Sequence, residues 1–264
     1  MHCPGLLPWQ ASAYLACCSH ASWPADSPKN PTSTSKKHYD YSNLRRPGLR
    51  QFSPRCHCCK HHGRRLRHIN VDLFKGESHT PAFLKLNPHG LTPVLQDGDT
   101  IIWEASAINI YLAEKAASPL LGKSASERYQ VLQWMFWSGE QWRVFATLLF
   151  NERVAGRAMG QAEDPSIVNL VLKNMRAAAA VLDAHLAGRR FIVGDELTMA
   201  DIDIAAPFSQ VARTRAPFAE FPNLWAWQQQ LLETVPAWAQ TRRVLDDRME
   251  SFLNGIGITL WGDL

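Results

Sequence analysis

The sequence predicts a two-domain protein of the α+β class, in which a small α/β domain precedes an all-helical domain. Three observations lead to this prediction. A strand pattern, a turn and a helix pattern follow one another within residues 87–115. From residue 123 to about residue 250 the apolar residues recur only at helical spacing. Charge divides the chain again, because residues 1–69 hold 11 of the 28 Lys and Arg residues but only 2 of the 24 Asp and Glu residues.

The α/β part centres on a predicted antiparallel hairpin. Apolar runs at 92–95 and 100–103 flank Asp97-Gly98, a pair favoured in tight turns that need a positive φ. Helical spacing begins directly after the second run. A helix start offers backbone N–H groups and the positive end of its dipole to a carboxylate, while Glu104 could pair with an ammonium group. This junction is a candidate site for a small acid.

The first 48 residues show no sustained helical or strand period. Residues 1–69 are rich in Arg, His, Cys, Pro and Ser, a mixture with little apolar surface to offset chain entropy. We expect residues 1–48 to be disordered or a non-native extension, because an upstream start or a shifted reading frame would give such a composition. The apolar stretch at 6–18 is too short to span a bilayer and makes a poor secretory signal, so we expect a cytoplasmic protein without membrane association.

Residues 56–62 contain possible zinc ligands, which are Cys56, His57, Cys58, Cys59, His61 and His62. Zinc sites usually combine two pairs of ligands with two to four residues inside each pair, and no second well-spaced pair exists here, so we expect no metal site. No cysteine follows residue 59, which argues against a secreted disulfide framework. The basic run at 64–68 lacks aromatic residues and a recognisable binding module, so we expect no nucleic-acid partner.

Helix caps and apolar stripes organise the second half of the chain. Ser124-x-x-Glu127 starts one long helix, and Asp164-Pro165 starts the next. Their predicted stripes are Leu132, Met135, Phe136, Gly139, Trp142, Ala146 and Leu149 in the first helix, and Ile167, Leu170, Val171, Met175, Ala178, Leu182 and Leu186 in the second. Thr198 and Asp201 have the spacing of a structural cap that fixes the start of a buried helix. We expect domains at 49–117 and 123–250 and a tail at 251–264.

Several of these runs resemble bacterial-type, cytosolic glutathione transferases between about residues 68 and 250. The run VDLFKGESHTPAFLKLNPHG at 71–90, the Thr-x-x-Asp box, the run PNLW at 222–225 and the run VPA at 235–237 carry the resemblance in order. Residues 1–67 do not match. The resemblance implies a thioredoxin-like first domain that binds glutathione, a helical second domain and a homodimer.

The resemblance also implies glutathione-binding residues. The family's proline, which follows an NP-x-G segment and has a cis peptide bond, corresponds to Pro93, and such a bond would turn the backbone of Val94 toward the ligand. The family's acid corresponds to Glu104. Its serine directly follows the acid, whereas this chain has Ala105 there and Ser106 one position later. The chain therefore departs from the family's pattern at the residue that would contact the ligand's carboxylate.

The family's catalytic Ser, Tyr or Cys ends the first strand, and Ser53 is the only hydroxyl in a comparable place. The alternative is that Ser53 is a turn residue before a proline. Four rings on the first long helix, Trp134, Trp137, Trp142 and Phe145, form either core or an apolar wall for a second substrate. For that wall we single out Trp137 and Arg143.

The resemblance implies a transferase that joins the glutathione thiolate to a small hydrophobic electrophile, with glutathione as co-substrate and no metal. The displaced serine leaves a second hypothesis open, a non-catalytic binding or scaffold protein with an incomplete active site. A third is a truncated or mistranslated gene product with an incomplete first domain.

Overall fold

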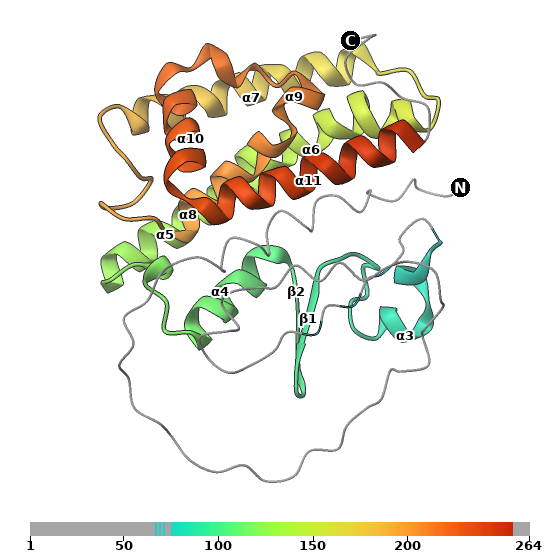
Figure 1. Cartoon of the computed structure of the whole chain (residues 1–264), viewed down its shortest axis with the longest axis horizontal. Helices are drawn as coiled ribbons and strands as arrows, with labels where there is room; N and C mark the ends of the chain where they lie inside the picture. Colours follow the sequence, from blue (N-terminus) through green and yellow to red (C-terminus); the bar gives the residue numbers. More distant parts are fainter. Residues whose placement is uncertain (1–66, 68, 70, 72–74, 256–264) are drawn as a thin grey trace.

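The computed structural model describes residues 67, 69, 71 and 75–255 and arranges them in two domains (Figure 1). The hairpin, its flanking helices and the turns around them form the first domain, and helices alone form the second. The predicted α+β organisation is confirmed. Ser53, the possible zinc ligands at 56–62 and the predicted extension at 1–48 lie outside the described residues.

The hairpin organises the described part of the first domain. β1 (Val94–Asp97) and β2 (Thr100–Trp103) pair antiparallel, with Val94 opposite Trp103. The turn consists of residues 98–99, one position later than the predicted Asp97-Gly98, and Gly98 has a φ of +64°. Glycine suits this position because it adopts a positive φ without a steric penalty. A single residue then separates β2 from α4 (Ala105–Lys115).

A short helical segment precedes the hairpin. A 3₁₀ turn (Glu77–His79) leads into α3 (Pro81–Leu84), whose N-cap Thr80 accepts a hydrogen bond from the N–H of Phe83 at 3.4 Å. The sheet of the described residues consists of β1 and β2 alone.

The second domain consists of helices that follow a 3₁₀ turn (Pro119–Leu121). In chain order they are α5 (Ala125–Trp137), a π-helical turn (Ser138–Arg143), α6 (Val144–Phe150), a second π-helical turn (Asn151–Gly156), α7 (Pro165–Leu186), α8 (Met199–Ala205), a 3₁₀ turn (Ala206–Gln210), α9 (Val211–Thr214), a 3₁₀ turn (Pro217–Glu220), α10 (Pro222–Thr234) and α11 (Pro236–Gly255).

The core of this domain surrounds α8, in which every residue is buried. Trp142 is fully buried beside it and donates its indole N–H to the carbonyl of Ile204 at 2.9 Å. The Trp142 ring also stacks on Phe218, with 4.5 Å between the ring centroids. Because the indole N–H has a partner, this large ring is buried without leaving a polar group unsatisfied.

Three positions in the predicted stripes, Phe136, Ile167 and Leu170, are exposed rather than part of the core. Phe136 is 71% exposed, and the buried row on that helix instead includes Val131, Met135 and Ser138. The core position is occupied by the polar residue Ser138, whereas the apolar periodicity predicted Phe136 there. In α7, Leu170 is 60% exposed, because only the opposite side of that helix packs on the bundle.

Candidate functional site

The predicted site residues around the hairpin come together at the point where β2 gives way to α4. Val94 begins β1 directly opposite Trp103, the last residue of β2, so the start of one strand lies beside the end of the other. The peptide bond between Thr92 and Pro93 is cis. Glu104 follows Trp103, and α4 starts immediately after it. The first residue of β1 and the last residue of β2 therefore lie together at the open end of the hairpin, beside the start of α4.

Glu104 has an unusual backbone for a glutamate. Its φ is +73° and its ψ is +119°, and its carbonyl accepts a hydrogen bond from the N–H of Ile108 in the first turn of α4 at 2.9 Å. A non-glycine residue in such a conformation costs about 1 to 3 kcal/mol. The side chain is exposed, and its carboxylate has no hydrogen-bond or ion-pair partner among the described residues. An acid is thus held outward at the helix start at an energetic cost.

The start of α4 supplies donors beside that acid. The first N–H groups of an α-helix have no acceptor within the helix, and they carry the positive end of its dipole. Ala105 occupies the first position and is 8% exposed, so it contributes an N–H group but no hydroxyl. An anion placed here would meet backbone donors and no side-chain hydroxyl from Ala105.

The hydroxyl of Ser106 points toward the helical domain. It donates a hydrogen bond to Oδ1 of Asp203 in α8 at 3.0 Å and accepts one from Nη2 of Arg143 at 3.2 Å. The Arg143 Nε atom lies 3.1 Å from Oδ2 of Asp203. Ser106 is therefore part of an interdomain cluster, and any contact with a ligand carboxylate competes with these two bonds.

Asp203 belongs to this cluster, although the sequence patterns did not predict a role for it. Its side chain is only 2% exposed. Burial raises its pKa, and the charge of Arg143 and the hydroxyls of Ser138 and Ser106 oppose that shift. The one signal in the sequence was an acid placed two residues after Asp201 in an otherwise apolar helix. Buried carboxylates are usually paired with a cation or a hydrogen-bond donor, so an acid in an apolar helix indicates that such a partner lies nearby.

The two residues predicted for the substrate wall lie apart. Arg143 contacts Ser106 at the start of α4, as described above. Trp137 instead lines an open cleft of about 170 Å³ between α7 and the segment that runs from the end of α5 to α6. The other lining residues are Gln141, Phe145, Asn174, Ala177, Ala178 and Val181. All of these lining residues belong to the helical domain. Arg143 is not among the residues that line this cleft.

The cap at the start of α8 brings together Thr198 and Asp201. One carboxylate oxygen of Asp201 accepts the N–H of Thr198 at 2.8 Å and its hydroxyl at 2.9 Å. The other accepts the N–H of Ile192 at 2.8 Å and the indole N–H of Trp227 at 3.4 Å. These contacts form a capping box and also tie the preceding loop and α10 to α8.

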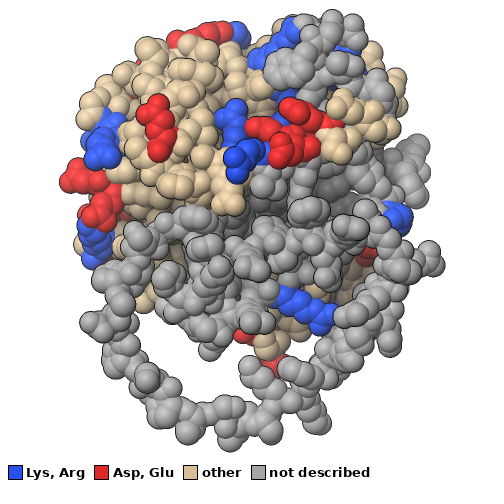
Figure 2. Space-filling view, viewed as in Figure 1, with Lys and Arg blue, Asp and Glu red and all other residues tan. Residues whose placement is uncertain are grey.

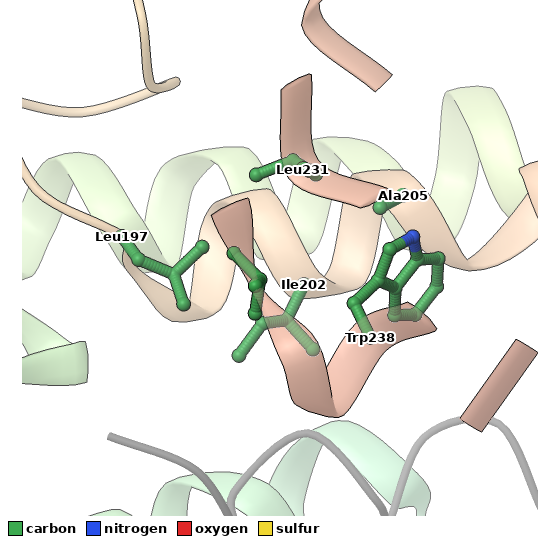
Figure 3. Close-up of a pocket in the computed structure, with 6 residues that line it drawn as sticks. Leu197, Ile202, Ala205, Leu231 and Trp238 are labelled. Carbon is green, nitrogen blue, oxygen red and sulfur yellow. The ribbon is translucent and has the colours of Figure 1, made fainter. Parts of the chain in front are cut away.

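A second space in the helical domain is too small to hold a ligand (Figure 3). It measures about 10 Å³ and is lined by Leu197, Ile202, Ala205, Leu231, Val235 and Trp238. A space of that size holds about one water molecule at most, and this one is apolar. It is a packing defect between α8, α10 and α11.

Metal and membrane features are absent from the described part of the chain. Residues 75–255, with 67, 69 and 71, contain no group of three or more His, Cys, Asp or Glu side chains that could hold a metal ion. Among the same residues no helix combines the length and the apolar character needed to cross a bilayer. On the face shown in Figure 2, basic and acidic side chains are interspersed over the helical domain.

Comparison with known proteins identifies the family. The glutathione S-transferase N-terminal domain matches residues 52–114, and the C-terminal domain of the same family matches residues 155–229. The family match therefore begins at residue 52, before the expected start near residue 68. The chain is 33% identical to glutathione S-transferase 3 of Zea mays, over 66% of this chain and 80% of that protein. It is 34% identical to GstB of Escherichia coli strain K12, over 60% of this chain and 76% of that protein.

A solved structure shows the same fold. Glutathione S-transferase I from maize, in complex with an atrazine glutathione conjugate, superposes with a TM-score of 0.63 at 23% identity, over 72% of this chain and 90% of that chain. The domain order, the hairpin with its following helix and the helical bundle agree with this likeness. The chain therefore belongs to the glutathione S-transferase family, with a thioredoxin-like N-terminal domain and an all-helical C-terminal domain.

Proposed function

We propose that the chain is a glutathione transferase that joins the sulfur of glutathione to a small hydrophobic electrophile. The observation that carries this proposal is the junction between β2 and α4. Glu104 holds an unpartnered carboxylate outward, beside the N–H groups at the start of α4. The γ-glutamyl end of glutathione carries an ammonium and a carboxylate on one carbon, so it needs an acid and a set of donors side by side.

The proposed reaction starts from the thiolate. A thiol with a pKa near 8.5 is only about 3% ionised at pH 7, and a shift to about 6.5 would raise this fraction roughly 25-fold. The thiolate sulfur then attacks an electrophilic carbon, forming a C–S bond while the electrophile's leaving group departs with the bonding electron pair. We propose Ser53 as the hydroxyl that stabilises the thiolate; it lies outside the described residues.

The known relatives support this assignment. The maize protein was solved with a glutathione conjugate of atrazine, which is the kind of product that this reaction yields. The glutathione subsite that we propose consists of Pro93, Val94, Glu104, Ala105 and Ser106. Of the two residues proposed for the electrophile, Arg143 is the better placed, because it contacts Ser106 while Trp137 faces a cleft within the helical domain.

Retention on immobilised glutathione, followed by a conjugation assay with an aryl halide, tests the proposal. We expect the chain to be retained and to catalyse conjugation. Glu104→Ala should weaken glutathione binding about 30- to 150-fold, because it leaves a desolvated ammonium unpaired. Glu233→Ala removes the same charge from an exposed position on α10 and should leave binding unchanged. Equal glutathione affinity of Glu104→Ala and the parent would show that the subsite is wrong.

A binding or scaffold protein is the second candidate. The observation that favours it is the helix start itself, where Ala105 lacks a hydroxyl and the hydroxyl of Ser106 is bonded to Asp203. Glutathione retention without conjugation would favour this alternative. Conjugation above the uncatalysed rate would exclude it.

We further propose that the chain pairs with a second copy of itself through the outer face of α6 and α7. The exposed apolar side chains of this face are Val144, Leu148, Ile167, Leu170 and Val181, each between 38% and 60% exposed. The cleft beside Trp137 is lined in part by residues of α6 and α7 and includes Val181. An apolar face of this kind is costly in water, and a second copy would cover it.

A further inference from the structure

Three polar residues from distant parts of the chain meet where the two domains touch. Ser106 is the second residue of α4, Arg143 ends the first π-helical turn, and Asp203 lies in the buried helix α8. The Ser106 hydroxyl donates to Asp203 at 3.0 Å, Arg143 donates to Ser106 at 3.2 Å, and the Arg143 and Asp203 side chains approach to 3.1 Å. Each member of this positioning cluster thus contacts the other two.

The π-helical turn makes the cluster possible. Ser138 and Arg143 are five residues apart, a separation that an α-helix would turn through about 140°, onto different faces. A π-helical turn closes its hydrogen bond at the fifth residue, so it brings both side chains to the side that faces Asp203. Gly139 leaves room for the guanidinium, because a Cβ atom there would lie 3.3 Å from Nη2 of Arg143. Local backbone geometry is therefore used to aim Arg143.

The burial of Asp203 indicates that the cluster serves geometry more than stability. The Asp203 side chain is 2% exposed and that of Arg143 is 23% exposed. Removing two charges from water costs about as much as their attraction returns, so such a pair adds little net stability. Its contribution is to fix the relative position of the groups that it joins. Here those groups are α8, the π-helical turn and the first turn of α4.

We propose that Arg143 and Asp203 are positioning residues for glutathione, which act by holding Ser106 and with it the start of α4. The assignment rests on the proposed function. Glu104 and the N–H groups of Ala105 and Ser106 belong to the same turn, so a shift of that turn moves all the groups that meet the γ-glutamyl end of glutathione. The helical domain thereby sets the affinity of a subsite that the other domain supplies.

A purely electrostatic role for Arg143 predicts the opposite change in glutathione affinity for the variant Asp203→Asn. If Arg143 acted only as a positive charge near the ligand carboxylate, Asp203→Asn would remove the opposing negative charge and tighten glutathione binding. If Arg143 acts through the position of α4, the same variant loosens the cluster and weakens binding. Ser106→Thr keeps the hydroxyl and should bind as the parent does, whereas Ser106→Ala loses both bonds.

Calorimetric titration of the full chain with glutathione tests the proposal. We expect Ser106→Ala, Arg143→Lys and Asp203→Asn each to weaken binding about 3- to 10-fold. The double variant Ser106→Ala with Arg143→Lys should lose little more glutathione affinity than the single variant with the larger loss, because both changes disrupt the same cluster. Ser106→Ala alone carries the test if Asp203→Asn does not fold.

The matched control is a second arginine–carboxylate pair in the same domain. Arg213 is 4% exposed and bonds to Asp246 in α11, and neither residue has a hydrogen bond or an ion pair with α4. Arg213→Lys and Asp246→Asn should lower the urea midpoint and leave glutathione affinity within about 2-fold of the parent.

The outcomes separate this inference from the proposed function. A parent chain that binds no glutathione overturns the proposed function and this assignment with it. A parent that binds glutathione, together with cluster variants that bind equally well, overturns this assignment alone. Tighter binding by Asp203→Asn, or an equal loss in the Arg213→Lys control, would also overturn it.

Discussion

Asp201 accepts both the backbone N–H of Thr198, at 2.8 Å, and its hydroxyl, at 2.9 Å. The carboxylate is fully buried, and its second oxygen takes N–H groups from Ile192 and Trp227. One side chain therefore satisfies the N-cap residue of α8, the loop before it and an indole from α10. The start of the central helix is fixed by the same group that joins its neighbours to it.

The capping box predicts unequal losses of stability. Thr198→Ala removes one side of the box and should cost about 1 to 2 kcal/mol. Asp201→Ala should cost more, roughly 3 to 4 kcal/mol, because it leaves several buried donors without an acceptor. The double variant should lose less than the sum, since the two residues share a contact. Urea unfolding of the three variants measures this, and fully additive small effects would contradict it.

The buried carboxyl also predicts a pH dependence. Burial, opposed by four hydrogen bonds, raises the pKa of Asp201 to about 6 from its usual 3.8. The folded state then binds more protons than the unfolded state between these values, so the stability from this group is present below pH 3.8 and lost as pH rises through about 6. The free energy of unfolding of the parent, minus that of Asp201→Asn, should fall by about 3 kcal/mol across this window.

Urea titrations of both chains at several pH values between the two pKa values measure this difference. Other groups titrate alike in both chains and cancel. A difference that stays constant, or that grows with pH, would show that Asp201 is ionised throughout the window.

The backbone of Glu104 predicts a conflict between stability and binding. Glycine adopts a φ of +73° without a steric penalty, so Glu104→Gly should be about 1 kcal/mol more stable than Glu104→Ala, which keeps the strain. Both variants lose the carboxylate, and both should lose glutathione affinity to a similar extent. Thermal unfolding and calorimetric titration of the pair measure the two effects. Equal stability would mean that the positive φ is not strained.

Restoring the family's serine should tighten glutathione binding. Ala105→Ser adds a hydroxyl at the first position of α4, where it can donate to the ligand carboxylate, and we expect a gain of about 5- to 10-fold in affinity. Ala107→Ser makes the same change at an exposed position two residues later and is the control. Affinity that rises equally in both variants, or in neither, would argue against the proposed orientation of the ligand.

The proposed pairing of two copies predicts a change of mass. Leu170→Glu and Val181→Glu each place a charge on the exposed face of α7 and should shift the parent's dimer toward monomer. Glu233→Lys changes charge on α10 and should leave the mass unchanged. Analytical ultracentrifugation of the full chain measures this. A monomeric parent, or dimeric variants, would contradict the proposal.

The predictions from local sequence hold where a residue and its partner are close in the chain. Ser124 and Asp164 cap the helices that they were predicted to start, because each side chain reaches an N–H two or three residues later. The antiparallel hairpin was found with its turn one residue later than predicted. Phe136 was assigned to the core but is exposed, because periodicity alone could not show that Ser138 takes that place.

The sequence by itself determined the two domains, the family and the acid at the helix start, since each depends on short-range patterns or on residues in consecutive order. Only the tertiary structure decided where Ser106 points and what Asp203 does. These two residues lie 97 positions apart, and their contact requires α4, the π-helical turn and α8 to pack together. Local propensity cannot predict this contact. The free energy of the buried Arg143–Asp203 ion pair, which Ser106 joins, depends on the burial and geometry that the rest of the fold provides.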